Sequence, residues 1–283
     1  MSKVPDGVAP DQLNTTARKV LLDGLEALAA HRAAITVIGA QAVYLRTSKA
    51  ALKSAAFTSD GDLALDPDVL GDEPLVDEAL TAAGFRLRHA EQPGLWVRPE
   101  VIDGRAVEVE LDILAGHSLA SGGRAARIPP HGKMSAKKVR GIEVAVVDRS
   151  PMVVRSLTPE DDRRVEVNVA GPVALLVAKA FKIEDRLLGA AKRPDRLVNK
   201  DAADVLRIMM AVPVREVASS LAELVRDPRV GPVATAGVEM LGTQFGGADA
   251  PGVQMAVDAL AGDVPADRVR LLAPAYLRNL HRT

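Results

Sequence analysis

The chain has 283 residues, of which 48% are hydrophobic, 2% are aromatic and none is cysteine. This length allows one large domain or two, and the apolar content is sufficient for a sizeable core. The lack of cysteine excludes disulfide bonds, thiolate zinc sites and a cysteine nucleophile. Because 36 Lys and Arg residues balance 37 Asp and Glu residues, the global charge gives no indication of nucleic-acid binding.

The N-terminal sequence and the hydropathy of the chain predict a soluble protein. No stretch of 18 or more residues is apolar throughout, which argues against a membrane-spanning segment. The first seven residues lead into a charged amphipathic segment, which is unlike a signal peptide. We therefore expect a cytoplasmic location.

Hydrophobic periodicity predicts an α/β arrangement in the N-terminal part of the chain. Helices are expected over 10–31, over a short segment after Gly39, and over 74–83. Short apolar or alternating runs predict strands over 34–38, 61–65, 85–89, 95–98, 105–114, 142–147, 152–157 and 164–168. The segment 115–141 is rich in Gly, Pro, Ser and Lys, and we expect a long loop or lid there.

The pattern changes near Gly171-Pro172, after which it is helical to the end of the chain. Proline and glycine residues separate helices expected over 172–190, 198–211, 214–225, 230–243, 252–261 and 265–280. The predicted architecture is therefore α/β (α+β), with a mixed-sheet domain and N-terminal helix over 1–168 and a helical domain over 169–283.

Two aspartates, Asp60 and Asp62, lie at the start of a predicted strand, in the run Phe-Thr-Ser-Asp-Gly-Asp-Leu-Ala-Leu. Side chains alternate along a strand, so both carboxylates point to the same side. Two like charges held that close favour a bound divalent cation. The alternative is a solvated turn, for which Ser-Asp-Gly is also typical.

Three further acids, Glu108, Glu110 and Asp112, alternate with apolar residues on a later predicted strand. A half-buried strand with a polar face would also explain this pattern. Acids on one face repel one another, so we expect cations beside them. Asp112 is the best candidate for a metal ligand, because apolar residues flank it at the end of the strand, and Glu110 is the second.

The predicted strand before Asp60 ends in glycine, at Gly39-Ala40, and leads into a helix. Backbone N–H groups at such a junction can hold a phosphate, and glycine allows the phosphate to approach closely. An ordinary turn between a strand and a helix is the more common explanation of a single glycine.

A glycine-ended strand, a helix, an Asp-x-Asp strand and a later acid, in this order, resemble the nucleotidyltransferase superfamily with a polymerase-β-like core. The resemblance implies that Asp60, Asp62 and Asp112 bind Mg²⁺ and act in catalysis. It also implies that the nucleotide is bound by Gly39, Ala40, Thr58 and Ser59. Ala40 replaces the family's second Gly or Ser, and the gap before Asp60, which contains Lys53, is longer than usual.

Charged residues on two later predicted helices indicate which members of this superfamily the chain resembles. Lys179, Lys182 and Arg186 share one helix face, and Asp201 and Asp204 share a face of the next helix. Salt bridges between solvated helices are the alternative explanation.

These elements resemble those of AbiEii- and MenT-type nucleotidyltransferase toxins, over roughly residues 33–210. The resemblance assigns Lys179 and Asp204 to catalysis, with Lys182 as a rival for the lysine role. It assigns nucleotide binding to Lys182, Arg186 and Asp201. The arginine that the family usually has before the acid pair is absent, since Ala55 and Ala56 stand there.

The activity that the resemblance implies is Mg²⁺-dependent transfer of a nucleoside monophosphate from an NTP to an acceptor hydroxyl. The expected acceptor is the 3′ end of tRNA, and the expected partner is a cognate antitoxin protein, with no membrane involved. Alternatives are a small-molecule acceptor such as an aminoglycoside, or a scaffold that has lost activity and binds a partner.

The segment 115–141 contains many basic residues and no acid. If it is not simply a solvated loop, it is expected to be a mobile arm that binds an RNA backbone or nucleotide phosphates. The basic residues are Arg124, Arg127, His131, Lys133, Lys137, Lys138 and Arg140.

Overall fold

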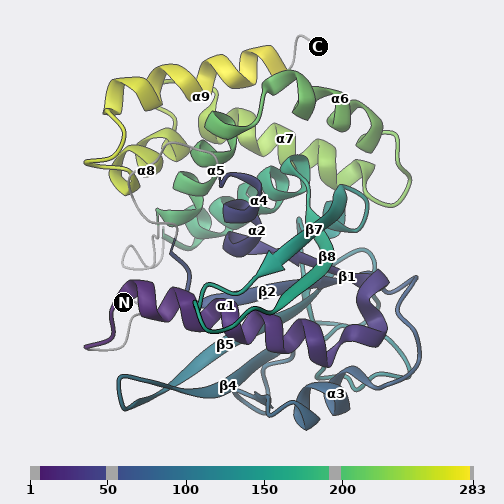
Figure 1. The fold of residues 1–283 in the computed structure, drawn as a ribbon. Helices are drawn as coiled ribbons and strands as arrows, with labels where there is room; N and C mark the ends of the chain where they lie inside the picture. Colours follow the sequence, from purple (N-terminus) through teal and green to yellow (C-terminus); the bar gives the residue numbers. More distant parts are fainter. Residues whose placement is uncertain (1–6, 49–56, 191–198, 281–283) are drawn as a thin grey trace. The chain divides into compact units, whose positions relative to one another are not determined.

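The computed structural model describes residues 7–48, 57–190 and 199–280 (Figure 1). Its internal contacts divide the chain into two compact units. The first unit consists of Met1–Ala42, Ala55–Val139 and Arg149–Ala170. The second consists of Val43–Ser54, Arg140–Asp148 and Gly171–Thr283, so two short segments of the N-terminal part belong with the C-terminal part.

The first unit contains a mixed sheet with the strand order β3-β4-β5-β2-β1-β8-β7, and β6 also pairs with β5. Three neighbouring pairs, β1/β8, β2/β5 and β5/β6, are parallel, and the other pairs are antiparallel. The strands are β1 (Ile35–Ile38), β2 (Asp60–Leu65), β3 (Arg86–Leu87), β4 (Leu95–Ile102), β5 (Arg105–Gly116), β6 (Lys137–Val139), β7 (Arg149–Arg155) and β8 (Arg164–Ala170).

Helix α1 (Pro10–Ala27) covers one face of this sheet, where it contacts β2, β4 and β5 (Figure 1). A proline at its first position and an acid in its first turn suit a helix N-terminus. The helix approaches the sheet closely, because a side chain at Gly24 would overlap Leu111. The 3₁₀ helix η1 (Ala29–Ala34) and helix α3 (Val76–Ala82) complete the first unit, and α2 (Gly39–Arg46) begins in it.

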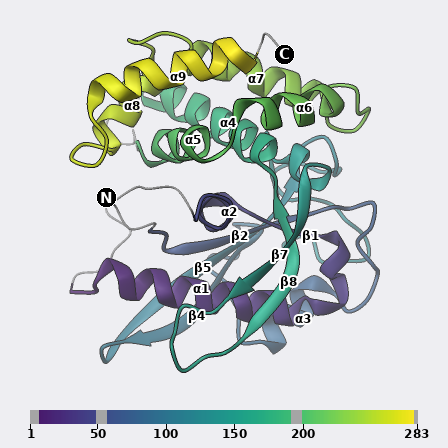
Figure 2. The ribbon, with the colours of Figure 1, turned by 45° about the horizontal axis from the view of Figure 1, so that its top comes forward.

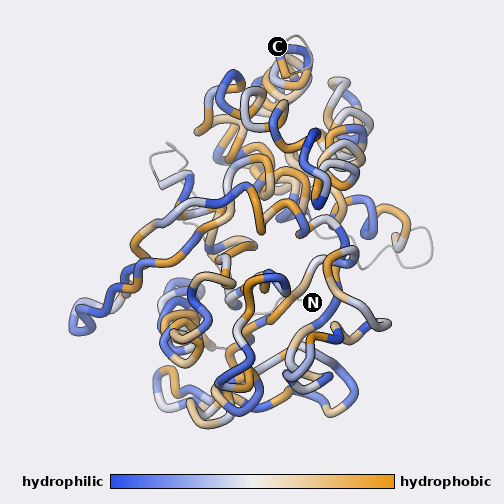
Figure 3. The backbone as a smooth tube through the Cα atoms, turned by 90° about the vertical axis from the view of Figure 1, so that its right-hand side faces the viewer, coloured by the Kyte–Doolittle hydropathy of each residue, from blue (hydrophilic) through white to orange (hydrophobic). Residues whose placement is uncertain are grey.

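The second unit is helical (Figure 2). Hydrophobic and hydrophilic residues alternate along its helices, as expected for amphipathic helices that bury one face (Figure 3). The elements are η2 (Glu143–Val146), α4 (Pro172–Ala190), α5 (Lys200–Ala211), α6 (Val214–Leu224), α7 (Gly231–Phe245), α8 (Pro251–Ala259) and α9 (Ala266–Leu280). No described helix is both long and apolar enough to cross a membrane.

The predicted class, a mixed α/β sheet followed by helices, is confirmed. The predicted strand over 142–147 is wrong, because Glu143–Val146 form the 3₁₀ helix η2. Gly141, which has φ +87°, turns the chain just before it, and the Glu143 carboxylate accepts a hydrogen bond from the Gly141 N–H at 2.7 Å. A short apolar run that is buried has the same hydropathy in a strand as in a helical turn.

Most of the segment 115–141 lacks regular secondary structure, as expected for a long loop, but parts of it are paired. It contains β6 and two isolated bridges, Ser121 with Arg127 and Ala125 with Lys137. The indole N–H of Trp96 also donates to the carbonyl of Ser135, at 3.1 Å. This segment is therefore attached to the sheet, through β6 and through the hydrogen bond from Trp96 on β4.

Candidate functional site

The parallel pairing of β2 with β5 brings the predicted acids together. Asp62 pairs with Asp112, and Asp60 pairs with Glu110. Paired residues on neighbouring strands point to the same face of a sheet, and so do residues two apart on one strand. Asp60, Asp62 and Asp112 therefore share one face, and all three are half-buried.

This acidic face is opposite to the face that α1 covers. Between the two aspartates of β2, Gly61 points to α1, and a side chain there would meet Leu21. Leu63 and Leu111 alternate with the acids and are fully buried. The strict alternation along β2 and β5 thus separates an apolar face, which builds the core, from a face that presents carboxylates.

Two of the acids on β5 are neutralised by arginines. Arg86 forms an ion pair with Glu108, and Arg88 forms one with Glu110. The cations expected beside these acids are therefore present. On β2, Asp60 lies beside Glu110 and Asp62 lies beside Asp112, so each of these two acids of β5 has a carboxylate neighbour.

Gly39 lies directly against the carboxylate of Asp62. It follows β1, opens α2 and has φ +68°, a conformation that side chains other than glycine rarely adopt. A Cβ atom at this position would overlap Oδ2 of Asp62. The glycine thus permits both the turn from strand to helix and the approach of the carboxylate to the backbone. Ala40, the next residue, is buried in the first turn of α2.

Thr58, two residues before Asp60, orients the Asp60 carboxylate. Thr58 is buried, and its hydroxyl donates a hydrogen bond to Oδ1 of Asp60. The backbone N–H of Thr58 donates to Oδ1 of Asn14 on α1, at 3.1 Å. Ser59 is half-buried in the bend between Thr58 and Asp60. Nothing in the sequence pattern pointed to Asn14, because this contact depends on the packing of α1.

The chemistry of these donors suits Mg²⁺, which prefers carboxylate oxygens. Within the described residues, however, no three acidic or histidine side chains are arranged as a complete metal site. Proteins commonly bind Mg²⁺ through one or two carboxylates together with the phosphates of a substrate. The adjacent carboxylates of Asp62 and Asp112, with Asp60 on the same face, fit this second mode.

Replacing Gly39 with alanine is expected to disturb the acidic face. The matched control is Gly104→Ala, because Gly104 also has a positive φ, +76°, but has open space around it. Both variants should lose about 1–2 kcal/mol of unfolding free energy through backbone strain. Only Gly39→Ala should also displace Asp62 and weaken the binding of Mg²⁺ with NTP, as measured by isothermal titration calorimetry. Equal affinities in the two variants would contradict the role of Gly39.

The second predicted group forms a buried ion-pair cluster in the second unit. Lys179, on α4, is 4% exposed, and its ammonium donates to Asp201 at 2.8 Å and to Asp204 at 2.6 Å. Arg186 contacts Asp201 at 2.6 Å, and Lys182 lies 3.7 Å from the same carboxylate. Three cations from α4 thus converge on two aspartates of α5.

The charges in this cluster stabilise one another. Burial by itself would lower the pKa of Lys179, but the carboxylates of Asp204 and Asp201 outweigh it, so this pKa is raised. Burial would likewise raise the pKa of Asp201, but Lys179, Lys182 and Arg186 outweigh it and lower that pKa well below its usual range. Lys179 and Asp201 are therefore both charged at neutral pH, and their ion pair joins α4 to α5.

The predicted site residues thus form two groups, one in each unit. The group in the first unit is Gly39, Ala40, Thr58, Ser59, Asp60, Asp62 and Asp112. The group in the second unit is Lys179, Lys182, Arg186, Asp201 and Asp204. Lys53, Ala55 and Ala56 lie outside the described residues.

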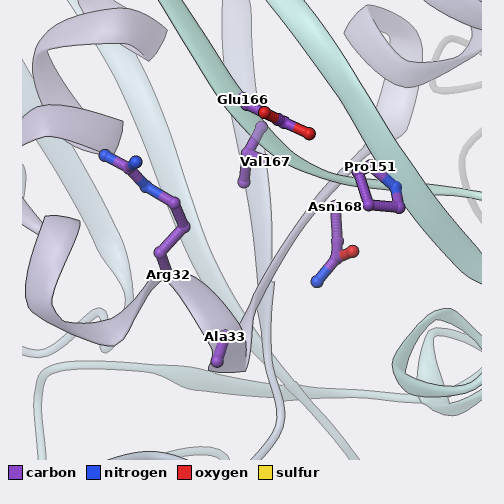
Figure 4. Close-up of a pocket in the computed structure, with 6 residues that line it drawn as sticks. All are labelled: Arg32, Ala33, Pro151, Glu166, Val167 and Asn168. Atoms are coloured by element: carbon purple, nitrogen blue, oxygen red, sulfur yellow. The ribbon is translucent and has the colours of Figure 1, made fainter.

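A cavity of about 260 Å³ lies elsewhere in the first unit, between η1 and the strands β7 and β8 (Figure 4). Its lining includes one cation, Arg32, one acid, Glu166, and one amide, Asn168. None of the predicted site residues lines this cavity. This cavity therefore gives no support to the predicted site.

No protein-family model and no curated protein sequence matches the chain. Among solved structures, the chain is similar to a crystal structure of an antigenic nucleotidyltransferase-like protein from Paracoccidioides brasiliensis. The two share 19% sequence identity with a TM-score of 0.40, over 81% of this chain and 94% of the other. Neither a family nor an activity follows from a likeness at this level.

Proposed function

We propose that the chain is a Mg²⁺-dependent nucleotidyltransferase that moves a nucleoside monophosphate from an NTP to an acceptor hydroxyl. The observation that carries this proposal is the register of β2 and β5, which sets Asp62 beside Asp112 with Asp60 on the same face. The close approach of Asp62 to Gly39, at the N-terminus of α2, supports it. A carboxylate pair beside a strand-to-helix turn combines metal ligands with backbone N–H groups for phosphate.

In this proposal, Asp60 and Asp62 hold the Mg²⁺·NTP complex, and Thr58 keeps Asp60 oriented. Mg²⁺ supplies charge stabilisation at the triphosphate and at the attacking oxygen. Gly39 and Ala40 donate backbone N–H groups to phosphate oxygens. The carboxylate of Asp112 accepts the proton of the acceptor hydroxyl, whose oxygen forms a bond to the α-phosphorus as pyrophosphate leaves.

The charged cluster of the second unit also enters the proposal. Lys179, oriented by Asp204, is assigned to neutralising charge on the triphosphate. Nucleotide contacts are assigned to Lys182, Arg186 and Asp201. Each of the three cations already contacts Asp201, so the aspartate would set the positions of these side chains.

For the acceptor, we propose the 3′ end of tRNA, with a cognate antitoxin that restrains the activity. The support is the ordered segment 117–140, which carries exposed basic residues such as Arg124, Arg127 and Lys133 and contains no acid. Such a segment suits the phosphate backbone of RNA. A catalytically inactive scaffold is the second candidate, because Ala40 stands where the family that the chain resembles has a second Gly or Ser, and the arginine which that family usually has before the acid pair is absent.

The experiment that tests this function is a label-transfer assay. The protein is incubated with each labelled NTP and with total tRNA or an aminoglycoside, in the presence of Mg²⁺ or EDTA. We expect labelled tRNA with Mg²⁺ and none with EDTA. Label on the aminoglycoside alone would replace the tRNA proposal with the small-molecule alternative. No transfer to either acceptor, together with unimpaired folding, would favour the scaffold.

A further inference from the structure

Strand β6 extends the acidic face beyond Leu95, the first residue of β4. β4 begins at Leu95, opposite Asp112, and β6 then takes its place along the same edge of β5. In the parallel register of β5 and β6, Lys137 pairs with Leu114. Asp112 and Leu114 are two apart and point to the same face, so Lys137 belongs to the face that presents the carboxylates.

The register also fixes the spacing between Lys137 and Asp112. They are separated by two residues along a strand and by one step between strands, which places their Cα atoms about 8 Å apart. A lysine carries its charge on a flexible four-carbon stem. Its ammonium can therefore reach a phosphate of an Mg²⁺·NTP complex bound at Asp60 and Asp62 beside Asp112.

The residues that the structure describes around Lys137 do not neutralise its ammonium charge, which is therefore available to a ligand. Its cross-strand neighbours are apolar, Leu114 on one side and Ala125 on the other. The segment from 113 to 142 contains no acid. Within the part of the chain that the structure describes, no ion pair joins Lys137 to a carboxylate. Among the acids that β2 and β5 present on this face, the register places Asp112 nearest to Lys137 and Asp62 next.

Lys138, the next residue, provides the contrast. It points to the opposite face of the strand, and its ammonium donates to the carbonyl of Gly122 at 3.1 Å. Backbone hydrogen bonds from Ala126 to Ala136 and from Lys138 to Arg124 hold this part of the chain in place. Strand β6 therefore places Lys137 on the acidic face. Lys138, by contrast, stabilises its own segment through the hydrogen bond to Gly122.

We propose that Lys137 is a phosphate-binding residue of the acidic face and contacts the phosphates of the bound NTP. This inference rests on the proposed function. The ammonium of Lys137 forms charge-assisted hydrogen bonds with phosphate oxygens and offsets the negative charge that the triphosphate brings to a face with three aspartates. Lys137 thus acts on the nucleotide and not on the RNA backbone.

The test compares Lys137→Ala with Lys138→Ala by calorimetric titration of a non-reactive NTP analogue with Mg²⁺. Lys137→Ala should weaken binding of the analogue by about tenfold or more, as the loss of a charged hydrogen bond does. Lys138→Ala should bind it as the wild type does. Lys137→Arg, which keeps the charge, should restore part of the affinity. The uncharged nucleoside should bind to the wild type and to all of these variants with the same affinity.

Three results would overturn the inference. If the wild type binds the analogue and Lys137→Ala binds it equally well, Lys137 does not contact the phosphates, and the proposed function stands. If Lys137→Ala weakens the binding of nucleoside and analogue by the same factor, the effect is on the fold of the site. If the wild type binds no NTP, the proposed function fails and this inference fails with it.

Discussion

The variant Asp62→Asn is expected to lose nucleotidyl transfer by about 10³-fold while its fold remains intact. The substitution keeps the size of the side chain and removes the charge that holds Mg²⁺ in the proposed function. A metal ion stabilises transition-state charge by several kcal/mol, and about 1.4 kcal/mol corresponds to a factor of ten in rate. Rates of label transfer at saturating Mg²⁺ measure the loss. Asp60→Ala should lose transfer in the same way.

The stability of Asp62→Asn, unlike its activity, should not fall. Asp62 and Asp112 are paired like charges, which destabilise a sheet by roughly 0.2–1 kcal/mol. Removing one of them should leave the free energy of unfolding unchanged or raise it by that amount, as urea denaturation would show. A gain in stability with a loss of activity is typical of residues selected for function.

A matched control is Glu108→Gln, on the same face of β5. Glu108 forms an ion pair with Arg86, and both side chains are largely exposed. Its loss should lower stability by at most about 1 kcal/mol and leave transfer unchanged. Transfer that survives both Asp60→Ala and Asp62→Asn would remove these residues from the mechanism.

The helices of the C-terminal part could be predicted closely from the sequence. For example, a helix was expected over 172–190, and α4 spans Pro172–Ala190. Proline residues mark the starts of several helices, such as Pro251 at the first position of α8. These signals are local, because helix termini depend on backbone conformation within a few residues.

The acidic face could be predicted only in part. The spacing of Asp60 and Asp62 sets both on one side of a strand, but the pairing of β2 with β5 joins residues 50 apart in sequence, and no local pattern determines it. The position of Lys137 could not be predicted from a local pattern either, because its segment has the composition of a loop. Its place beside β5 depends on pairing with Leu114 and Ala125, which the amino acids of the segment do not encode locally.

The cluster on α4 and α5 gives the second large effect, on stability. Lys179→Met is expected to lower the free energy of unfolding by roughly 3–5 kcal/mol, because it leaves the buried aspartates Asp201 and Asp204 without their shared cation. The methionine fills a similar volume, so the loss reports the missing charge. Urea denaturation followed by the helical circular dichroism signal measures it.

The control is Lys182→Met, which replaces an exposed lysine on the same face of α4. Lys182 is on the same helix face, but its side chain is 56% exposed and 3.7 Å from Asp201. Its loss should change the free energy of unfolding by at most about 1 kcal/mol. Equal losses in the two variants would contradict the central position of Lys179 in the cluster.

The pH dependence gives a further check on the cluster. The lowered pKa of Asp201 contributes stability above the ordinary aspartate pKa, near 4, which is lost as the pH falls through the folded value. The raised pKa of Lys179 contributes stability below the ordinary lysine pKa, near 10, which is lost as the pH rises through the folded value. Between about pH 4 and pH 10, the cluster should therefore add a constant amount to wild-type stability.

In Lys179→Met, the Asp201 carboxylate loses one of the cations that lower its pKa, so the difference from the wild type should shrink as the pH falls from 8 towards the ordinary aspartate pKa, near 4. A difference that is constant over this range would mean that the variant is destabilised by altered packing. The charge of the aspartates would then contribute little, and the interaction between α4 and α5 would depend mainly on their apolar contacts.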